Sequence, residues 1–259
     1  MARAGVFRAL GRSVLTPLRH AAGTFALLAY ALREAGALAL GPVRQVFYRQ
    51  VYFTGIQAMR ETSIIGLLIG VVVLTQIANL AGDDAALAGR VLVWAVVREL
   101  GPLFAAILVI TRSSSAVAAE LGTIRVNREM DHLRTMGVDP FRYLIVPRVL
   151  GLTVSLVALT VCFEAATILG GVLFSGIVMP APLLTQLQTV AGALRAFDVS
   201  VSLAKGVLFG LLIAASACHH GVLVRSSITE VPQATTKAVM QSLFLTVLAN
   251  VLVTVISFV

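Results

Sequence analysis

The chain has 259 residues, of which 58% are hydrophobic and only 12% are charged. Soluble domains contain about 25% charged residues, so the composition excludes an ordinary soluble domain and indicates an integral membrane protein. The net charge of +8 is no argument for a nucleic-acid partner, because Lys and Arg beside membrane spans set topology and contact anionic headgroups.

Residues 1–60 are expected to form a cytoplasmic and interfacial N-terminal region. Within them, Ala21–Gly41 is apolar but is interrupted by Arg33 and Glu34. This pattern favours a helix that lies in the membrane interface over a further crossing. The stretch Val43–Arg60 mixes aromatic and Arg residues, which is typical of an amphipathic approach to a first span.

Residues 61–259 are expected to form one transmembrane domain. An apolar run of about 20 residues can cross a hydrocarbon core of about 30 Å. We therefore expect an all-α integral membrane protein with an N-terminal interfacial helix, about five transmembrane helices and a short cytoplasmic helix. The predicted spans are Thr62–Ala81, Val91–Ile110, Leu144–Val172, Val201–Ala217 and Val239–Val259.

Basic residues indicate the orientation of these spans. Arg residues are concentrated before the first span and again between Arg112 and Arg148. Because cytoplasmic loops carry the excess of Lys and Arg, both of these segments are expected on the cytoplasmic side. With five spans, the C-terminus is then expected on the opposite, periplasmic side.

Four polar side chains of the predicted spans are candidate site residues, because charge is expensive inside a membrane. Arg98 and Glu99 form either an ion pair that packs helices or a polar group that faces a cavity for an amphiphile. Glu164 is a functional residue, a packing residue or a proton-relay group, and the sequence does not separate these roles. Gln76 is a weaker polar candidate, because amides often bridge membrane helices.

The string Arg112–Gly122 is rich in Ser, Ala and Gly. Small residues let membrane helices approach closely, so we interpret the string as a packing seam. A serine nucleophile would need a base within reach, and His132 is the one histidine near this string in the sequence.

A short charged helix is predicted at about residues 126–137. Its apolar residues Val126, Met130, Leu133 and Met136 are spaced by three or four, which places them on one helical face. The helix is too short to cross a bilayer. It therefore presents a face to a partner, or it is a solvated amphipathic loop.

Charged residues on the surface of this helix are expected to form ion pairs. Arg125 can pair with Glu129, and Asp131 can pair with Arg134, at helical spacings of three and four. Gly137 is expected to end the helix.

Residues 98–148 read RELGPLFAAILVITRSSSAVAAELGTIRVNREMDHLRTMGVDPFRYLIVPR. This block resembles the signature region of the MlaE/YrbE permeases, the membrane subunits of ABC systems that move phospholipids or related lipids together with MCE-domain proteins. The similarity extends from about Gln50 to the C-terminus. It includes Gln76, the ILGG sequence of the third span and the stretch Ala234–Ser242.

The resemblance implies a homodimeric, multi-pass permease of the bacterial inner membrane. Its implied partners are a cytoplasmic ABC ATPase, a periplasmic MCE-domain protein, a second copy of itself and phospholipid, with no nucleic acid. The chain has no GxxxxGK motif, so it is expected not to be an enzyme and to hold no cofactor, with ATP bound by the partner subunit. The implied lipid-binding residues are Arg98, Glu99, Gln76 and Glu164, and the implied ATPase-coupling residues are Arg128, Glu129, Met130, Leu133, Arg134 and Met136.

Four residues depart from the family pattern. Arg128 replaces an acidic residue that often opens the coupling helix, and Asn250 replaces a common Asp. His219 and His220 replace an aromatic or polar pair. We interpret these histidines as interface residues and expect no metal site, because no third ligand is evident in the sequence.

Two other functions compete with the permease interpretation. A secondary, proton-coupled transporter would use Glu164 without an ATPase. A membrane-embedded enzyme would use the serines or His219 and His220, but it lacks a convergent acid and base.

Overall fold

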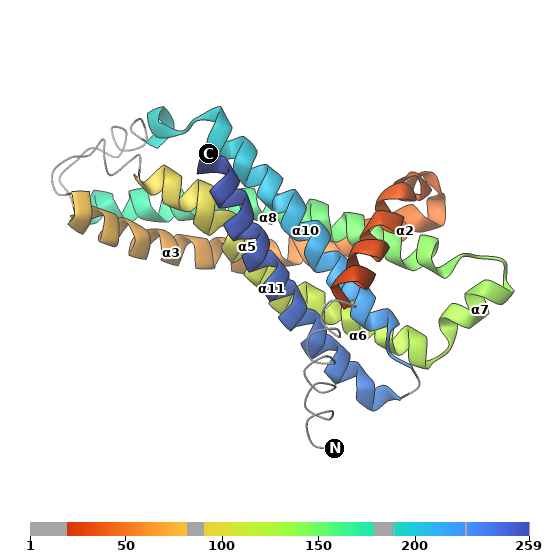
Figure 1. The fold of residues 1–259 in the computed structure, drawn as a ribbon. Helices are drawn as coiled ribbons and strands as arrows, with labels where there is room; N and C mark the ends of the chain where they lie inside the picture. The colour runs from red at the N-terminus through yellow and green to blue at the C-terminus, as the bar shows by residue number, and fades with distance from the viewer. Residues whose placement is uncertain (1–19, 82–90, 179–187, 189, 226, 259) are drawn as a thin grey trace, which may run out of the picture.

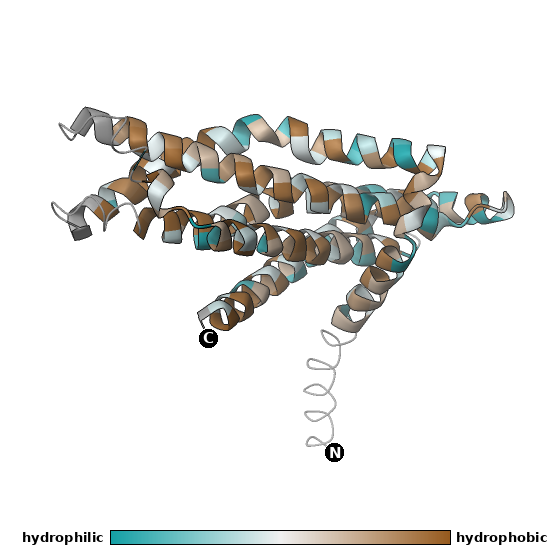
Figure 2. Ribbon diagram, turned by 90° about the horizontal axis from the view of Figure 1, so that it is seen from above, coloured by the Kyte–Doolittle hydropathy of each residue, from teal (hydrophilic) through white to brown (hydrophobic). Residues whose placement is uncertain are grey.

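The computed structural model describes residues 20–81, 91–178, 188, 190–225 and 227–258. Every regular element within these residues is a helix, and five helices are long and apolar enough to span a membrane. The predicted all-α integral membrane fold is therefore confirmed. Figure 1 shows the long helices as one elongated bundle, and Figure 2 shows hydrophobic residues over most of their length.

The first span begins earlier than the sequence suggested. Helix α2 (Gly41–Val51), the π-helical turn η2 (Tyr52–Ile56) and α3 (Gln57–Ala81) follow one another without a break, and the candidate span covers Gly41–Ile77. The aromatic stretch before the predicted span is thus part of the same helix. No break in the backbone marks the predicted boundary between residues 60 and 61.

The second span is one continuous helix over Val91–Val126. It contains the π-helical segment η3 (Trp94–Leu100), α5 (Gly101–Val109), the π-helical segment η4 (Ile110–Ser114) and α6 (Ser115–Val126). The span was predicted to end at Ile110. It continues because the small-residue string that follows is also helical.

The remaining helices complete the bundle. Helix α7 (Glu129–Thr135) is short, and η5 (Phe141–Ile145) leads directly into α8 (Val146–Val178). Helix α10 (Ala196–Val222) and the final helix α11 (Val231–Phe258), preceded by η6 (Ile228–Glu230), form the last two spans. All of these spans are longer at their N-terminal ends than the apolar runs that predicted them, because polar residues join the helices there.

Helix α8 lies at the centre of the bundle. Side chains at helical spacing on this helix are fully or almost fully buried, and they join the main apolar core. The spans of α8 and α10 are the most buried of the five, whereas the first and last spans are the most exposed. The buried α8 residues include Val149, Leu152, Leu156 and Leu159.

Glycines allow α3 and α8 to cross closely. A Cβ atom added at Gly70 of α3 would lie 2.0 Å from the Thr167 carbonyl oxygen, and one added at Gly170 of α8 would lie 2.3 Å from the Leu67 carbonyl oxygen. Both neighbours are backbone atoms that cannot rotate away. The crossing of α3 and α8 therefore requires glycine on both helices, which gives the ILGG sequence a packing role.

The small-residue string forms the packing seam predicted from the sequence. Ser113, Ser114, Ala118 and Gly122 are buried. Ser114 Oγ lies 3.4 Å from Ser242 Oγ of α11. The seam thus faces the rest of the bundle.

An N-terminal helix over residues 20–33 precedes the bundle. It runs across the long helices, not along them, in both views (Figures 1 and 2). This direction fits the predicted interfacial helix, because a helix that crosses the spans at their end lies along a membrane surface.

Candidate functional site

A buried charge pair connects three helices inside the spanning region. Lys205 of α10 is 0% exposed. Its Nζ donates to Glu99 Oε2 at 3.0 Å, to Thr254 Oγ1 at 3.0 Å and to the Arg98 carbonyl oxygen at 2.8 Å. An ammonium group has three donors, so these three contacts use all of them.

Glu99 accepts further hydrogen bonds from α11. Thr254 Oγ1 lies 3.0 Å from each Glu99 carboxylate oxygen, and Asn250 Nδ2 lies 3.4 Å from Oε2. We call Arg98, Glu99, Lys205, Asn250 and Thr254 the Lys205 cluster. Asn250 contributes an amide donor here without adding a second carboxylate beside Glu99.

Arg98 extends the cluster toward the end of the bundle. Its side chain is 8% exposed. One guanidinium nitrogen donates to the Ser257 carbonyl oxygen at 2.6 Å, and the guanidinium carbon lies 5.7 Å from the ring centre of Phe197. Arg98 therefore links the second span to α11 and to the start of α10.

Arg98 and Glu99 lie within a candidate span, as predicted, but the sequence analysis missed Lys205. The structure gives Glu99 an ion pair with Lys205. The signal was available, because Lys205 lies inside the predicted span Val201–Ala217, and a lysine within a span marks a functional or paired site. Isolating such a charge from water costs several kcal/mol unless it is paired and hydrogen-bonded.

Glu164 of α8 contacts α10 one helical turn before Lys205. Ser202 Oγ donates to Glu164 Oε1 at 2.5 Å, and Ser202 precedes Lys205 by three residues, so both polar contacts lie on one face of α10. A Cβ atom added at Gly101 would lie 2.5 Å from Glu164 Cγ. Glu164 is thus packed at the contact of α8 with α10 and the second span.

Gln76 does not join this group of polar residues. It is exposed on α3, and the hydrogen bonds of the Lys205 cluster do not involve it. Of the four predicted lipid-binding residues, the structure brings three into neighbouring contacts and leaves Gln76 on an outer surface.

The predicted coupling helix is shorter than expected. It comprises Glu129–Thr135, and Val126 ends the preceding helix. Arg128 lies between the two helices with φ +58°, in the left-handed region that residues with a Cβ seldom adopt. The left-handed conformation of Arg128 interrupts the helix between Val126 and α7, so the expected range of 126–137 is corrected.

The apolar stripe of this helix mostly faces its own protein. Met130 is 1% exposed and belongs to the main core, and Leu133 packs against that core. Met136, by contrast, is 77% exposed. Among the predicted coupling residues, the exposed ones are Arg128, Glu129, Arg134 and Met136.

The surface ion pairs of α7 partly match the prediction. Asp131 pairs with Arg134 at 3.6 Å, as expected. Arg125 lies 3.5 Å from Asp131, whereas it was expected to pair with Glu129. Gly137 has φ +79° and follows the end of the helix, which confirms the predicted stop.

Two polar contacts fasten the N-terminal helix to the segment after α7. Tyr30 Oη donates to Asp139 Oδ2 at 2.7 Å, and Arg142 pairs with Glu34 at 2.6 Å. We call these four residues the Tyr30 latch. Burial, then the hydrogen bond to Asp139, raises the pKa of Tyr30 to about 12, so its hydroxyl remains a donor at neutral pH. No local sequence pattern predicts this contact between distant segments.

The histidine pair meets a third histidine from the N-terminal helix. The ring centres of His20, His219 and His220 lie 5.2–5.7 Å apart. His220 Nε2 lies 2.5 Å from Gln241 Oε1. Within the described residues, no group of three or more His, Cys, Asp or Glu side chains is arranged to hold a metal ion. The histidines thus form an interface between α10, α11 and the N-terminal helix.

Comparison with known proteins identifies relatives over most of the chain. The family described as Permease MlaE matches residues 47–256. A probable ABC transporter permease protein of Rickettsia prowazekii is 32% identical over 168 residues, which cover 65% of each chain. A probable ABC transporter permease protein of Synechocystis is 33% identical over 162 residues, which cover 62% of each chain.

A plant protein is also similar. The Arabidopsis thaliana protein TRIGALACTOSYLDIACYLGLYCEROL 1, chloroplastic, is 36% identical over 155 residues, which cover 60% of this chain and 44% of the plant protein. The matched segment thus spans 65% of the length of the Rickettsia relative and less of the plant protein. Since the family match extends over residues 47–256 of 259, the chain belongs to the MlaE permease family.

Proposed function

We propose that this chain is the permease subunit of an ABC transporter that moves phospholipid or a related lipid between the bacterial inner membrane and a periplasmic MCE-domain partner. The family match over residues 47–256 is the observation that carries the proposal. Two kinds of relative support it, since several are named as probable ABC transporter permeases and one is named for a galactolipid. In this proposal a cytoplasmic partner subunit binds and hydrolyses ATP, and this chain performs no catalysis and needs no cofactor.

The continuous second span suggests how the partner would act on the membrane region. The helix over Val91–Val126 carries Glu99 near one end and meets α7 at the other. Two π-helical segments, η3 and η4, interrupt it, and π segments often occur at functional sites in helices. A force applied at α7 would therefore be transmitted along one helix to the Lys205 cluster.

The exposed part of the coupling region is the proposed ATPase contact. Arg128, Glu129, Arg134 and Met136 are exposed around α7, whereas buried Met130 anchors α7 to the core. An anchored helix with an exposed charged surface can transmit a push because it cannot slide freely over the core. Met130 and Leu133 therefore act as anchors in this proposal, and the four exposed residues make the contact.

The proposed lipid cavity lies between two copies of the chain, so one copy supplies only part of its wall. Arg98, at the end of the Lys205 cluster, supplies positive charge for an anionic headgroup. Glu99 and Glu164 act mainly by holding the helices, since Lys205 and Ser202 already occupy their carboxylates. Gln76, exposed on α3, is available to a lipid or to the second copy.

The proposed orientation follows the distribution of basic residues. Arg residues cluster around α7 and in the N-terminal region, which places both on the cytoplasmic side by the positive-inside rule. The C-terminus and the Lys205 cluster are then nearer the periplasmic side.

The proton-coupled alternative depends on Glu164. Its hydrogen bond from Ser202 and its close approach to Gly101 favour a packing role. The alternative requires that Glu164→Gln abolish transport driven by a pH gradient without any nucleotide. In the permease proposal, the same variant can preserve both the hydrogen bond to Ser202 and the shape of the side chain.

Isolation of the native complex tests the proposal. The full chain is purified under mild conditions from its own membranes, and native mass spectrometry identifies the bound subunits and lipids. We expect two copies of the chain with two ABC ATPase subunits and bound phospholipid. A chain isolated intact without any ATPase subunit, yet active in lipid transfer, would contradict it.

A further inference from the structure

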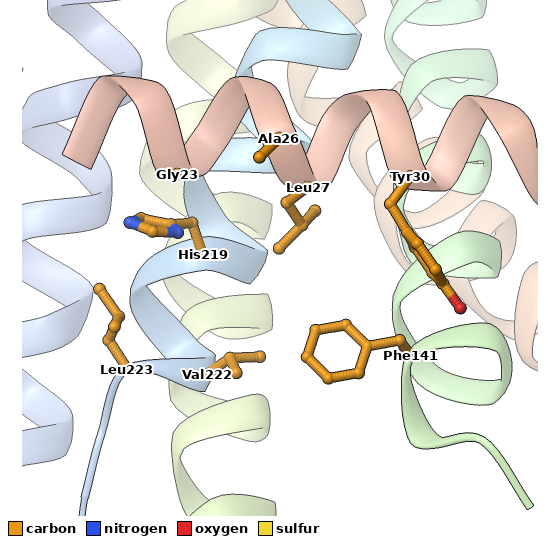
Figure 3. A pocket seen from close by; sticks show the side chains of 8 residues that line it. All are labelled: Gly23, Ala26, Leu27, Tyr30, Phe141, His219, Val222 and Leu223. Carbon is orange, nitrogen blue, oxygen red and sulfur yellow. The ribbon is translucent and has the colours of Figure 1, made fainter. Parts of the chain in front are cut away.

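A cavity lies beneath the N-terminal helix, away from the Lys205 cluster. Its volume is about 480 Å³, and it is formed between the N-terminal helix, the end of α10 and the start of η5. Figure 3 shows the side chains of Leu27, Phe141 and Val222 around this space. None of its lining residues belongs to the Lys205 cluster or to α7.

Polar contacts hold the helix in place at both ends of the cavity. At one end, Gln241 Nε2 donates to Thr24 Oγ1 at 2.9 Å. The imidazole of His219 lies against Gly23, where an added Cβ would be 2.2 Å from its Cε1 atom. At the other end, the Tyr30 latch fixes the helix to the segment after α7. The helix is thus fixed on both sides of a gap that its own side chains do not fill.

The chemistry of the walls restricts what can fill this gap. The lining is mostly apolar, and its two side chains with polar groups are Tyr30 and His219; the apolar residues are Gly23, Ala26, Leu27, Phe141, Val222 and Leu223. The Tyr30 hydroxyl already donates to Asp139. Ordered water needs several polar partners and is not retained by apolar walls. An apolar occupant therefore fits most of this lining, while the imidazole of His219 provides one polar group beside Gly23.

The size and position of the cavity indicate which kind of apolar molecule it can bind. The volume lies within the range of about 300–1,000 Å³ that is typical of small-molecule sites. A helix from a partner is about 10–12 Å wide, so the cavity has room for only about one helical turn. Phe25 and Leu32 of the same helix are 50% and 48% exposed on its outer surface. Such a helix rests in a membrane interface, where the abundant apolar molecules are the acyl chains of the bilayer.

We propose that this cavity binds one acyl chain of a phospholipid from the leaflet at the α7 end of the bundle. The site is distinct from the lipid path proposed above and does not depend on it. Tyr30 and Phe141 line the cavity, and their rings contact each other. Tyr30 is also the residue of the Tyr30 latch that donates to Asp139. A bound acyl chain therefore stabilises the attachment of the N-terminal helix to the segment after α7.

Photolabelling with a lipid tests this site. The full chain is placed in nanodiscs of phosphatidylethanolamine and phosphatidylglycerol that contain a phospholipid with a diazirine on one acyl chain. After illumination, mass spectrometry locates the adducts. Leu27 and Val222 report on the cavity, and Leu68 of α3, which is 63% exposed, reports on contact with the bulk bilayer.

Matched variants distinguish a cavity site from bulk lipid. Ala26 and Ala29 are both exposed on the same helix, but Ala26 lines the cavity and Ala29 does not. We expect Ala26→Phe to abolish labelling of Leu27 and Val222 while labelling of Leu68 persists, and Ala29→Phe to behave like the unmodified chain. Val222→Phe, which fills the cavity from the opposite wall, should likewise abolish labelling of Leu27.

Three results would overturn the proposal. The unmodified chain could carry no adduct at Leu27 or Val222 although Leu68 is labelled. Labelling could persist in both Ala26→Phe and Val222→Phe, or it could fall equally in Ala29→Phe. Because every arm uses labelling of the chain alone, the outcome is independent of whether the protein proves to be an ABC permease.

Discussion

Lys205 Nζ lies 3.0 Å from Glu99 Oε2 although the lysine is completely buried in the spanning region. This pair joins α10 to the second span, and Thr254 joins both to α11. The same second span continues to α7. In the proposed function, the charge pair therefore lies where a movement of α7 would reach the interior of the spanning region.

Removing the lysine tests how strongly the cluster holds these helices. Loss of one partner leaves the other charge buried, which typically costs about 3–5 kcal/mol. We expect Lys205→Met to lower the thermal unfolding temperature clearly, as measured on purified protein in detergent.

The double variant Lys205→Met with Glu99→Gln provides the control. It removes both charges, so it should be more stable than Lys205→Met alone, with a coupling of about 0.5–3 kcal/mol as found for residues in contact. Strictly additive effects of the two substitutions would show that the pair does not act as a unit.

The glycine crossing gives a second prediction. An alanine at position 170 would place its Cβ 2.3 Å from the Leu67 carbonyl oxygen, and overpacking of this kind costs about 1–3 kcal/mol. We expect Gly170→Ala to reduce thermal stability. Gly36→Ala is the matched control, because a Cβ at Gly36 meets nothing within 4 Å. Equal stability of the two variants would contradict the close crossing of α3 and α8.

Much of the fold was predictable from the sequence because apolar length alone identifies a membrane span. The five spans and the small-residue seam follow from such local patterns. The ends of the helices could not be predicted in this way, since the polar residues around Gln57 and Arg112 continue the helices beyond the apolar runs. Arg112, for example, pairs with Glu61 and bonds to Gln57 at 3.2 Å.

The candidate site was harder to predict because its contacts join distant segments. Glu99 and Lys205 are 106 residues apart in the sequence, and Tyr30 and Asp139 are 109 apart. A charged residue within a span indicates that a partner exists, but it does not say which one. The burial of Met130 could likewise not be predicted from the sequence, because an apolar stripe on a helix can face either a partner or the core of its own protein.

Arg128 allows the charge of the coupling region to be separated from its backbone conformation. At φ +58°, Asn is tolerated better than most residues, whereas Val pays a steric cost of about 1–2 kcal/mol. We expect Arg128→Asn to preserve thermal stability and to weaken retention of the ATPase subunit on co-purification.

Arg128→Val separates the two effects, because it should lower stability as well. The charge-reversed variant Glu129→Lys should also weaken ATPase retention. If Arg128→Asn and Glu129→Lys both retain the ATPase subunit fully, these residues are not part of the proposed contact.

The Tyr30 latch predicts a dependence on pH. Folding raises the pKa of Tyr30 from 10.0 to about 12, so the neutral hydroxyl stabilises the folded state. This contribution is fully present below pH 10 and is lost as the pH rises toward about 12. The difference in thermal stability between the unmodified chain and Tyr30→Phe should therefore be constant up to pH 10 and shrink above it.

Tyr48→Phe is the matched control for this titration, since Tyr48 is 59% exposed on α2. It should change stability little at any of these pH values. A Tyr30→Phe difference that disappears well below pH 10 would show that the hydroxyl does not hold Asp139 in solution.

ATP-driven lipid movement tests the central claim most directly. The complex of this chain with its ATPase is reconstituted in liposomes, and transfer of a labelled phospholipid to an acceptor MCE-domain protein is followed with ATP, with a non-hydrolysable analogue and with a pH gradient alone. We predict transfer that requires both hydrolysable ATP and this chain and that falls in Lys205→Met at matched protein levels. Transfer that proceeds with a pH gradient alone, without nucleotide, and is abolished by Glu164→Gln would contradict the account.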